Sequence, residues 1–137
     1  MSVGFQVGQV IDEIGSAGFL HAFFSTISHH LEPDGWGTRY PLIMNDLYRG
    51  KLATSDALRV LHDVLDIRER LRSYPPSEVV WDIDDPKARP PWGDKISQEI
   101  TALSNYFVTS TGRDMFEVLI DCLRAAQSGR DLRIVHF

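Results

Sequence analysis

Histidine side chains offer the clearest chemistry in this sequence. His21 and Ser25 stand four residues apart, a spacing that puts an imidazole and a hydroxyl on one face of a helix, where they could act as base and nucleophile. His29 and His30 are adjacent and would point about 100° apart on a helix, which suits a shared metal ion poorly. Neither an orienting third group nor an oxyanion hole is supplied nearby. A small hydrolase or metalloenzyme built on these four residues is therefore an alternative, and a polar stripe on a core helix is the favoured interpretation.

Four aspartates gather around a loop in the second half of the chain. They are Asp82, Asp84, Asp85 and Asp94. Such oxygen ligands can bind Mg²⁺ or Ca²⁺, but the EF-hand spacing and its closing glutamate are absent, and we expect no metal or other cofactor. Trp81 and Trp92 lie beside the cluster, and tryptophan with neighbouring charge is typical of interface hot spots. The segment is therefore either a solvated strand end or an acidic surface for a protein partner, and both rings could instead cover the core.

Acidic residues outnumber basic ones, and they are unevenly distributed. The chain has 19 Asp and Glu against 14 Lys and Arg, a formal net charge of −5. Residues 1–35 contain no Lys or Arg, and their acids are Asp12, Glu13, Glu32 and Asp34. Direct binding of nucleic acid needs clustered Lys and Arg, which argues against that function, whereas a negative side suits a cationic protein partner. Glu32 and Asp34, in a predicted turn, form a second candidate contact patch.

Cysteine content and hydropathy bear on the compartment. Cys122 is the single cysteine, so no intrachain disulfide can form, and its place on an apolar helical face indicates a structural role. The first residues carry no positive charge and no signal-like apolar run. The longest uncharged stretch, 14–31, is too polar to span a bilayer. We therefore expect a cytoplasmic protein without a membrane partner.

Hydrophobic periodicity predicts the elements that must position these side chains. Strands are predicted over 3–10, 78–83, 106–109 and 132–137, and helices over 16–31 with Ser16 as the cap, over 41–49 and over 55–72. A last helix follows Thr111 and Asp114, which form a near capping box, and stops at Gly129. Its inner face is expected to hold Met115, Phe116, Leu119, Cys122, Leu123 and Ala126. The 55–72 helix is expected to turn Leu58, Leu61, Val64, Leu65 and Leu71 inward. Length and pattern predict a single α+β domain over 1–137, a small, mostly antiparallel sheet packed against about four helices.

Several stretches together resemble a known family. They are VGFQVG (3–8), EIGS (13–16), FLHAFFSTI (19–27), GWGTRYP (35–41), VWDI (80–83), PPWG (90–93) and LSNYFVTS (103–110). None is a catalytic signature, but their order and number resemble the immunity protein 70 family of bacterial polymorphic toxin and contact-dependent growth inhibition systems.

This resemblance implies a non-enzymatic antidote. Such a protein binds the C-terminal domain of a cognate secreted toxin, commonly a nuclease, so we expect a cationic ribonuclease whose active site is covered. No catalytic residue carries over from the family. The expected partner contacts are Trp81, Asp82, Asp84, Asp85, Trp92 and Asp94, with Glu32 and Asp34 of the turn. We expect a monomer or weak dimer, and a self-associating subunit paired through its C-terminal strand is a second alternative.

Overall fold

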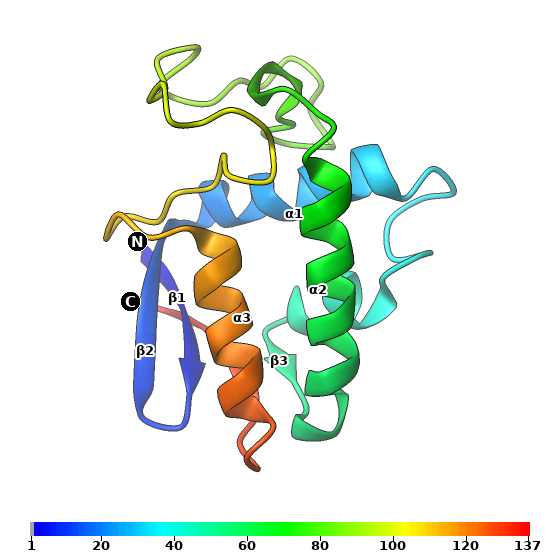
Figure 1. Cartoon of the computed structure of the whole chain (residues 1–137), viewed down its shortest axis with the longest axis vertical. Helices are drawn as coiled ribbons and strands as arrows, with labels where there is room; N and C mark the ends of the chain where they lie inside the picture. The colour runs from blue at the N-terminus through cyan, green and yellow to red at the C-terminus, as the bar shows by residue number, and fades with distance from the viewer. Residues whose placement is uncertain (1) are drawn as a thin grey trace.

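Both ends of the chain lie in one antiparallel sheet. The computed structural model describes residues 2–137, with strands β1 (Ser2–Val7), β2 (Val10–Ser16), β3 (Lys51–Leu52) and β4 (Leu132–His136). The strand order is β2-β1-β4-β3, so the two central strands come from opposite ends of the chain (Figure 1). Ser2 and Phe137 exchange backbone hydrogen bonds of 2.8 and 2.9 Å. This topology confirms the predicted α+β class with an antiparallel sheet.

The described part of the chain has three α-helices, of which the first and the third pack on this sheet and the second packs mainly on the third. They are α1 (Ala17–Leu31), α2 (Ala57–Leu71) and α3 (Met115–Ala126), accompanied by a π-helical segment η1 (Leu42–Leu47) and the 3-10 turns η2 (Thr54–Asp56) and η3 (Pro76–Glu78). The start of α1 is fixed by the predicted cap, because Ser16 Oγ accepts the Phe19 amide at 3.1 Å. Asp114 caps α3 in the same way, accepting the Phe116 amide at 2.8 Å. None of the helices within residues 2–137 has the length and apolarity needed to cross a membrane.

One hydrophobic core joins the sheet to the helices. Val3, Phe5 and Val7 of β1 face it, as their alternation predicts. Phe23 of α1 stands edge-on against Phe116 of α3, with ring centroids 5.2 Å apart. The predicted inner face of α3 is confirmed, since all six of its residues are buried: Met115, Phe116, Leu119, Cys122, Leu123 and Ala126.

The inner face of α2 differs from the prediction in two positions. Leu58 is 53% exposed and Leu65 is 36% exposed, whereas Leu61, Val64 and Leu71 are buried as expected. The helix begins at Ala57 and turns Val60 and Ile67 inward instead. The buried residues of α2 recur mostly at intervals of three and four positions and so share one stripe of the helix, and Leu58 and Leu65 fall outside that stripe.

The strand predictions need three corrections. The strand expected over 3–10 is a hairpin, because Gly8 adopts a φ of 61° and the chain turns between Val7 and Val10. The strand expected over 106–109 is a single bridge between Val108 and Asp114. The two-residue β3 was not expected at all. Residues 72–113 hold only one short 3-10 turn, η3: the first loops of this range lie beyond α1, and the chain then returns past α1 to the start of α3 (Figure 1).

A leucine pair on α2 tests this packing. Leu71→Ala removes a fully buried side chain and should lower the free energy of unfolding by about 2–5 kcal/mol. Leu58→Ala is the matched control, and because its side chain is exposed the change should stay within about 0.5 kcal/mol. Urea unfolding followed by circular dichroism measures both. Equal losses in the two variants would contradict the orientation of α2.

Candidate functional site

The segment predicted as a strand over 78–83 packs along helix α1 instead of joining the sheet. We call residues 78–83 the crossing segment. Thr26 Oγ1 accepts the Val80 amide at 3.1 Å and donates to the Val80 carbonyl at 3.2 Å. Ser25 Oγ accepts the amide of Ile83 at 3.2 Å. Both hydroxyl residues are fully buried, which confirms the polar stripe expected on this helix. The strand prediction is wrong because helix side chains, not a neighbouring strand, satisfy these backbone groups.

His21 of α1 faces this segment, and Tyr48, Asp82 and Asp84 lie around its imidazole. Its Nε2 is 3.1 Å from Asp82 Oδ1, and its Nδ1 is 3.0 Å from the Tyr48 hydroxyl. Asp82 Oδ1 also accepts the Asp84 amide at 2.9 Å. The Asp84 amide and then the His21 hydrogen bond lower the pKa of Asp82. We call His21, Tyr48, Asp82 and Asp84 the His21 cluster.

The other members of the suggested catalytic set lie elsewhere. Ser25 is buried and its hydroxyl is engaged by Ile83. His30 Nε2 contacts the Glu78 carbonyl oxygen at 2.7 Å, which ties the start of the crossing segment to the end of α1. His29 is one wall residue of a cavity beside that segment. The four residues His21, Ser25, His29 and His30 therefore do not converge on one site.

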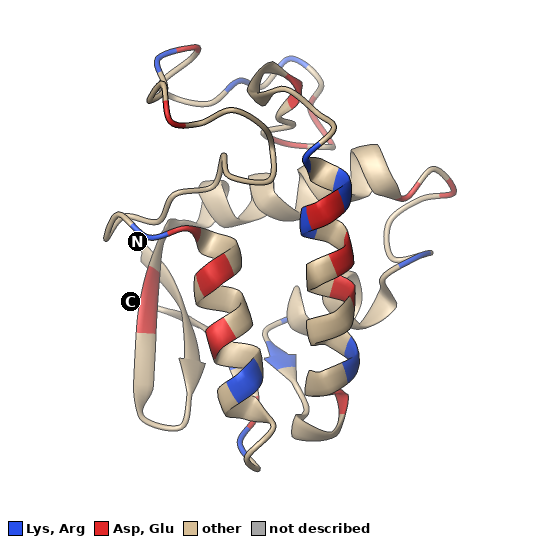
Figure 2. Ribbon diagram, viewed as in Figure 1, with Lys and Arg blue, Asp and Glu red and all other residues tan. Residues whose placement is uncertain are grey.

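An open cavity of about 1080 Å³ lies between the crossing segment and the loop that follows it. Its walls include Trp81, Asp82, Asp85, Arg89, Asp94 and Tyr106. Three of the four predicted aspartates thus line one cavity, while Asp84 belongs to the His21 cluster. Residues 76–99 carry six acidic and three basic side chains, interspersed on the loops beyond α1 (Figure 2). The surroundings of the cavity are therefore acidic on balance.

The two tryptophans support this hollow. Trp81 and Trp92 stand edge-to-face with centroids 5.4 Å apart, and Trp92 contacts Phe19 of α1 in the same manner at 6.1 Å. The Trp92 indole N–H donates to the Tyr106 hydroxyl at 2.9 Å. Trp81 is a cavity wall residue and also packs against the core. The rings therefore cover the core and shape the cavity at once.

Glu32 is not part of an acidic surface patch. Its side chain is buried, with 3% of the residue exposed, and the carboxylate accepts the amides of Gly37, Arg39 and Tyr40 at 3.0–3.1 Å. A carboxylate used in this way holds the turn after α1 and is inaccessible to a partner, so its expected contact role is withdrawn. Asp34 is exposed and remains a candidate.

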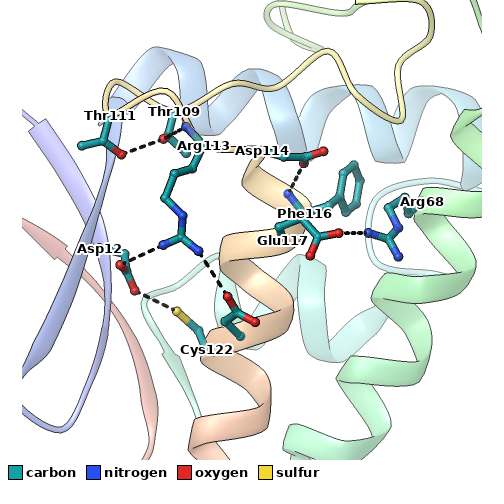
Figure 3. Close-up of polar contacts among 10 residues, drawn as sticks. Asp12, Arg68, Thr109, Thr111, Arg113, Asp114, Phe116, Glu117 and Cys122 are labelled. Carbon is teal, nitrogen blue, oxygen red and sulfur yellow. Dashed lines mark hydrogen bonds and ion pairs between the residues drawn. The ribbon is translucent and has the colours of Figure 1, made fainter.

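The acids near the N-terminus also do not form a free negative side. Arg113 reaches Asp12 at 3.5 Å and Asp121 at 3.2 Å, which connects β2 to α3 (Figure 3). Cys122 Sγ donates to Asp12 Oδ2 at 3.5 Å. Burial, reinforced by Asp12, raises the pKa of Cys122 to about 12, so the thiol stays protonated and the structural role expected for it is supported. Glu13 accepts the Ser110 hydroxyl at 2.9 Å.

Two contributors to these sites were missed in the sequence. Tyr48 and Glu78 carry no local signal, because their partners His21 and His30 lie 27 and 48 residues away. The pairing of His21 with Asp82 spans 61 residues and was equally invisible. The only available signal was the pair of adjacent polar residues on α1, Ser25 and Thr26. Buried hydroxyls need hydrogen-bond partners, which a distant segment can supply.

Comparison with known proteins gives one result. The family model described as immunity protein 70 matches residues 5–134. A search of curated proteins and a search of solved structures each gave no match.

The buried Glu32 carboxylate makes a stability prediction. Glu32→Gln replaces one acceptor oxygen by an NH₂ group that opposes backbone donors, and should lower the free energy of unfolding by about 1–3 kcal/mol. Asp34→Asn, two residues away and exposed, is the control and should change it little. Chemical denaturation of the two variants side by side measures this, and a loss in Asp34→Asn alone would refute the assignment.

The lowered pKa of Asp82 makes a pH prediction. Its charged form is stabilised only in the fold, so the contribution is present above the ordinary aspartate pKa of about 4 and is lost as pH falls through the lowered value. Asp82→Asn should therefore be less stable than the wild type at pH 5, and the difference should shrink below pH ~4. Denaturation midpoints across this range measure it, and a pH-independent difference would disprove the linkage.

Proposed function

Because this chain belongs to the immunity protein 70 family, we propose that it binds a cognate bacterial toxin domain and neutralises it. The observation that carries the proposal is the family match, which runs from residue 5 to residue 134 and so takes in all three α-helices and part of each central strand. The same membership favours inhibition by binding over catalysis.

The local chemistry agrees with a non-enzymatic role. Ser25, the nucleophile candidate named from the sequence, is buried with its hydroxyl engaged, and the Cys122 thiol is held protonated beside Asp12. The imidazole of His21 is engaged on both sides by Tyr48 and Asp82. An attacking group that is buried, protonated or already bonded is poorly placed to act on a substrate.

The acidic cavity is the surface we propose for toxin contact. Asp85 and Asp94 lie on its walls with Trp81, while Trp92 and Asp84 flank it. An aromatic wall supplies contact area at low entropic cost, and carboxylates around it attract a cationic partner. Asp82 contributes its charge while it is held by His21, and Asp34 stays a separate, less supported candidate.

A ribonuclease is the toxin class that suits this charge. Enzymes that cleave nucleic acid present basic clefts to the phosphate backbone, and an acidic inhibitor can occupy such a cleft in place of the substrate. The proposed antidote acts in the cytoplasm of the producing cell. Protection against a few toxin molecules requires nanomolar binding or tighter, which corresponds to roughly −12 kcal/mol.

Charge reversal on the cavity wall tests this proposal. The double variant Asp85→Lys/Asp94→Lys should weaken binding to the cognate toxin domain by about 2–5 kcal/mol, roughly 30-fold or more, and make the residual affinity less sensitive to salt. Calorimetry at several ionic strengths, with the catalytically inactivated toxin domain encoded beside this chain, measures both effects.

The matched control makes the same change of net charge at two positions away from the cavity. Asp46→Lys/Glu69→Lys changes the net charge equally on two exposed positions outside the cavity and should leave affinity close to wild type. Equal weakening in both double variants would mean that only net charge matters. Wild-type affinity of the cavity variant would remove this surface from the interface, and an absence of any complex would refute the antidote function itself.

A further inference from the structure

We propose that the His21 cluster binds one divalent transition-metal ion of the Zn²⁺ type. The ligands are His21 Nε2 and one carboxylate oxygen from each of Asp82 and Asp84, atoms that all lie within 4.8 Å of one another. The proposal rests on this geometry alone and does not depend on the toxin-binding function.

The ligand set selects the class of ion. One imidazole with two carboxylates suits Zn²⁺ and its first-row neighbours, whereas Mg²⁺ and Ca²⁺ prefer six or more oxygens. Zn–N and Zn–O bonds of about 2.1 Å place tetrahedral ligand atoms roughly 3.4 Å apart. His21 Nε2 and Asp82 Oδ1 are already 3.1 Å apart. Asp84 is exposed and its side chain can complete the set, with water as the fourth ligand.

Tyr48 orients the imidazole from its other side. Its hydroxyl lies 3.0 Å from His21 Nδ1, and the Trp36 ring stacks on the imidazole at a centroid distance of 6.2 Å. When Nε2 binds a metal, the ring proton resides on Nδ1 and can be donated to the Tyr48 oxygen. Metal-bound histidines are commonly held by an outer partner of this kind. The cluster therefore contains both a ligand set and the support that orients it.

The charge of the cluster also favours a cation. With neutral His21, the two aspartates give the cluster a charge of −2. Among the ion pairs of residues 2–137, Asp82 pairs with His21 and no Lys or Arg pairs with Asp82 or Asp84. A bound divalent ion would neutralise this charge.

Metal binding would fasten the crossing segment to α1. The ligands come from the helix and from residues 82–84, and Asp82 is also a wall residue of the acidic cavity. An ion that binds only when these parts are assembled stabilises the fold in proportion to its concentration. Metal-dependent thermal stability is therefore a readout that needs no toxin.

Titration of metal-free protein with ZnCl₂ at pH 7.5 tests the site. We expect one ion per chain by calorimetry and a melting temperature that rises with Zn²⁺. Tyr48→Phe keeps the aromatic packing and should weaken binding about 10- to 100-fold. Asp84→Asn removes a ligand whose side chain is exposed, so this variant should fold and bind at least about tenfold more weakly.

An exposed histidine away from the cluster provides the control. His62→Gln, on α2, should bind Zn²⁺ like the wild type. Absence of stoichiometric binding, unchanged affinity in Asp84→Asn, or loss of binding in His62→Gln would each overturn the site. Binding of MgCl₂ as tight as that of ZnCl₂ would overturn the transition-metal class. None of these results bears on whether the chain binds a toxin.

Discussion

Two buried hydroxyls on helix α1 fix the position of residues 78–83, which carry part of the proposed contact surface. Residues 72–113 hold only one short 3-10 turn, so their backbone groups cannot rely on a ladder of their own. Thr26 satisfies both polar groups of Val80, and Ser25 satisfies the amide of Ile83. Because an unpaired buried polar group is costly, these contacts fix where the segment crosses the helix. The position of Trp81, of Asp82 and of the cavity beside them follows from that crossing.

Local sequence signals predicted the frame of the fold well. The Ser16 cap, the apolar face of α3 and the alternation of β1 are short-range patterns, and the structure confirms each of them. The expected capping box of α3 needs a correction, because Asp114 and not Thr111 is the cap. The strand expected over 78–83 shows the limit of such reasoning. Alternation of apolar and polar residues indicates only that every second side chain packs against the protein, and the packing partner can be a helix as well as a second layer of a sheet. What the backbone bonds to is a long-range property.

The candidate site was predicted in its parts but not in its arrangement. Composition drew attention to His21 and to the aspartates separately, yet 61 residues separate His21 from Asp82. The negative surface expected over residues 1–35 is absent among the described residues, 2–35, for a related reason. Arg113 pairs with Asp12 only in the folded chain, and the Glu32 carboxylate is buried on backbone amides. A count of charges along the sequence is therefore a poor guide to the electrostatic potential at the surface, because folding pairs some acidic side chains with basic ones and leaves others exposed.

The order of strands has a consequence for how the chain matures. β1 pairs with β4, so β1 gains its second neighbour only when a strand about 125 residues further along the chain joins the sheet. The hairpin of β1 and β2 is at best marginally stable alone, because a two-stranded ribbon buries little apolar surface. Contacts between distant parts of a chain form late. The sheet therefore stays incomplete without β4, and a variant that lacked β4 would leave both β1 and β3 without their shared neighbour.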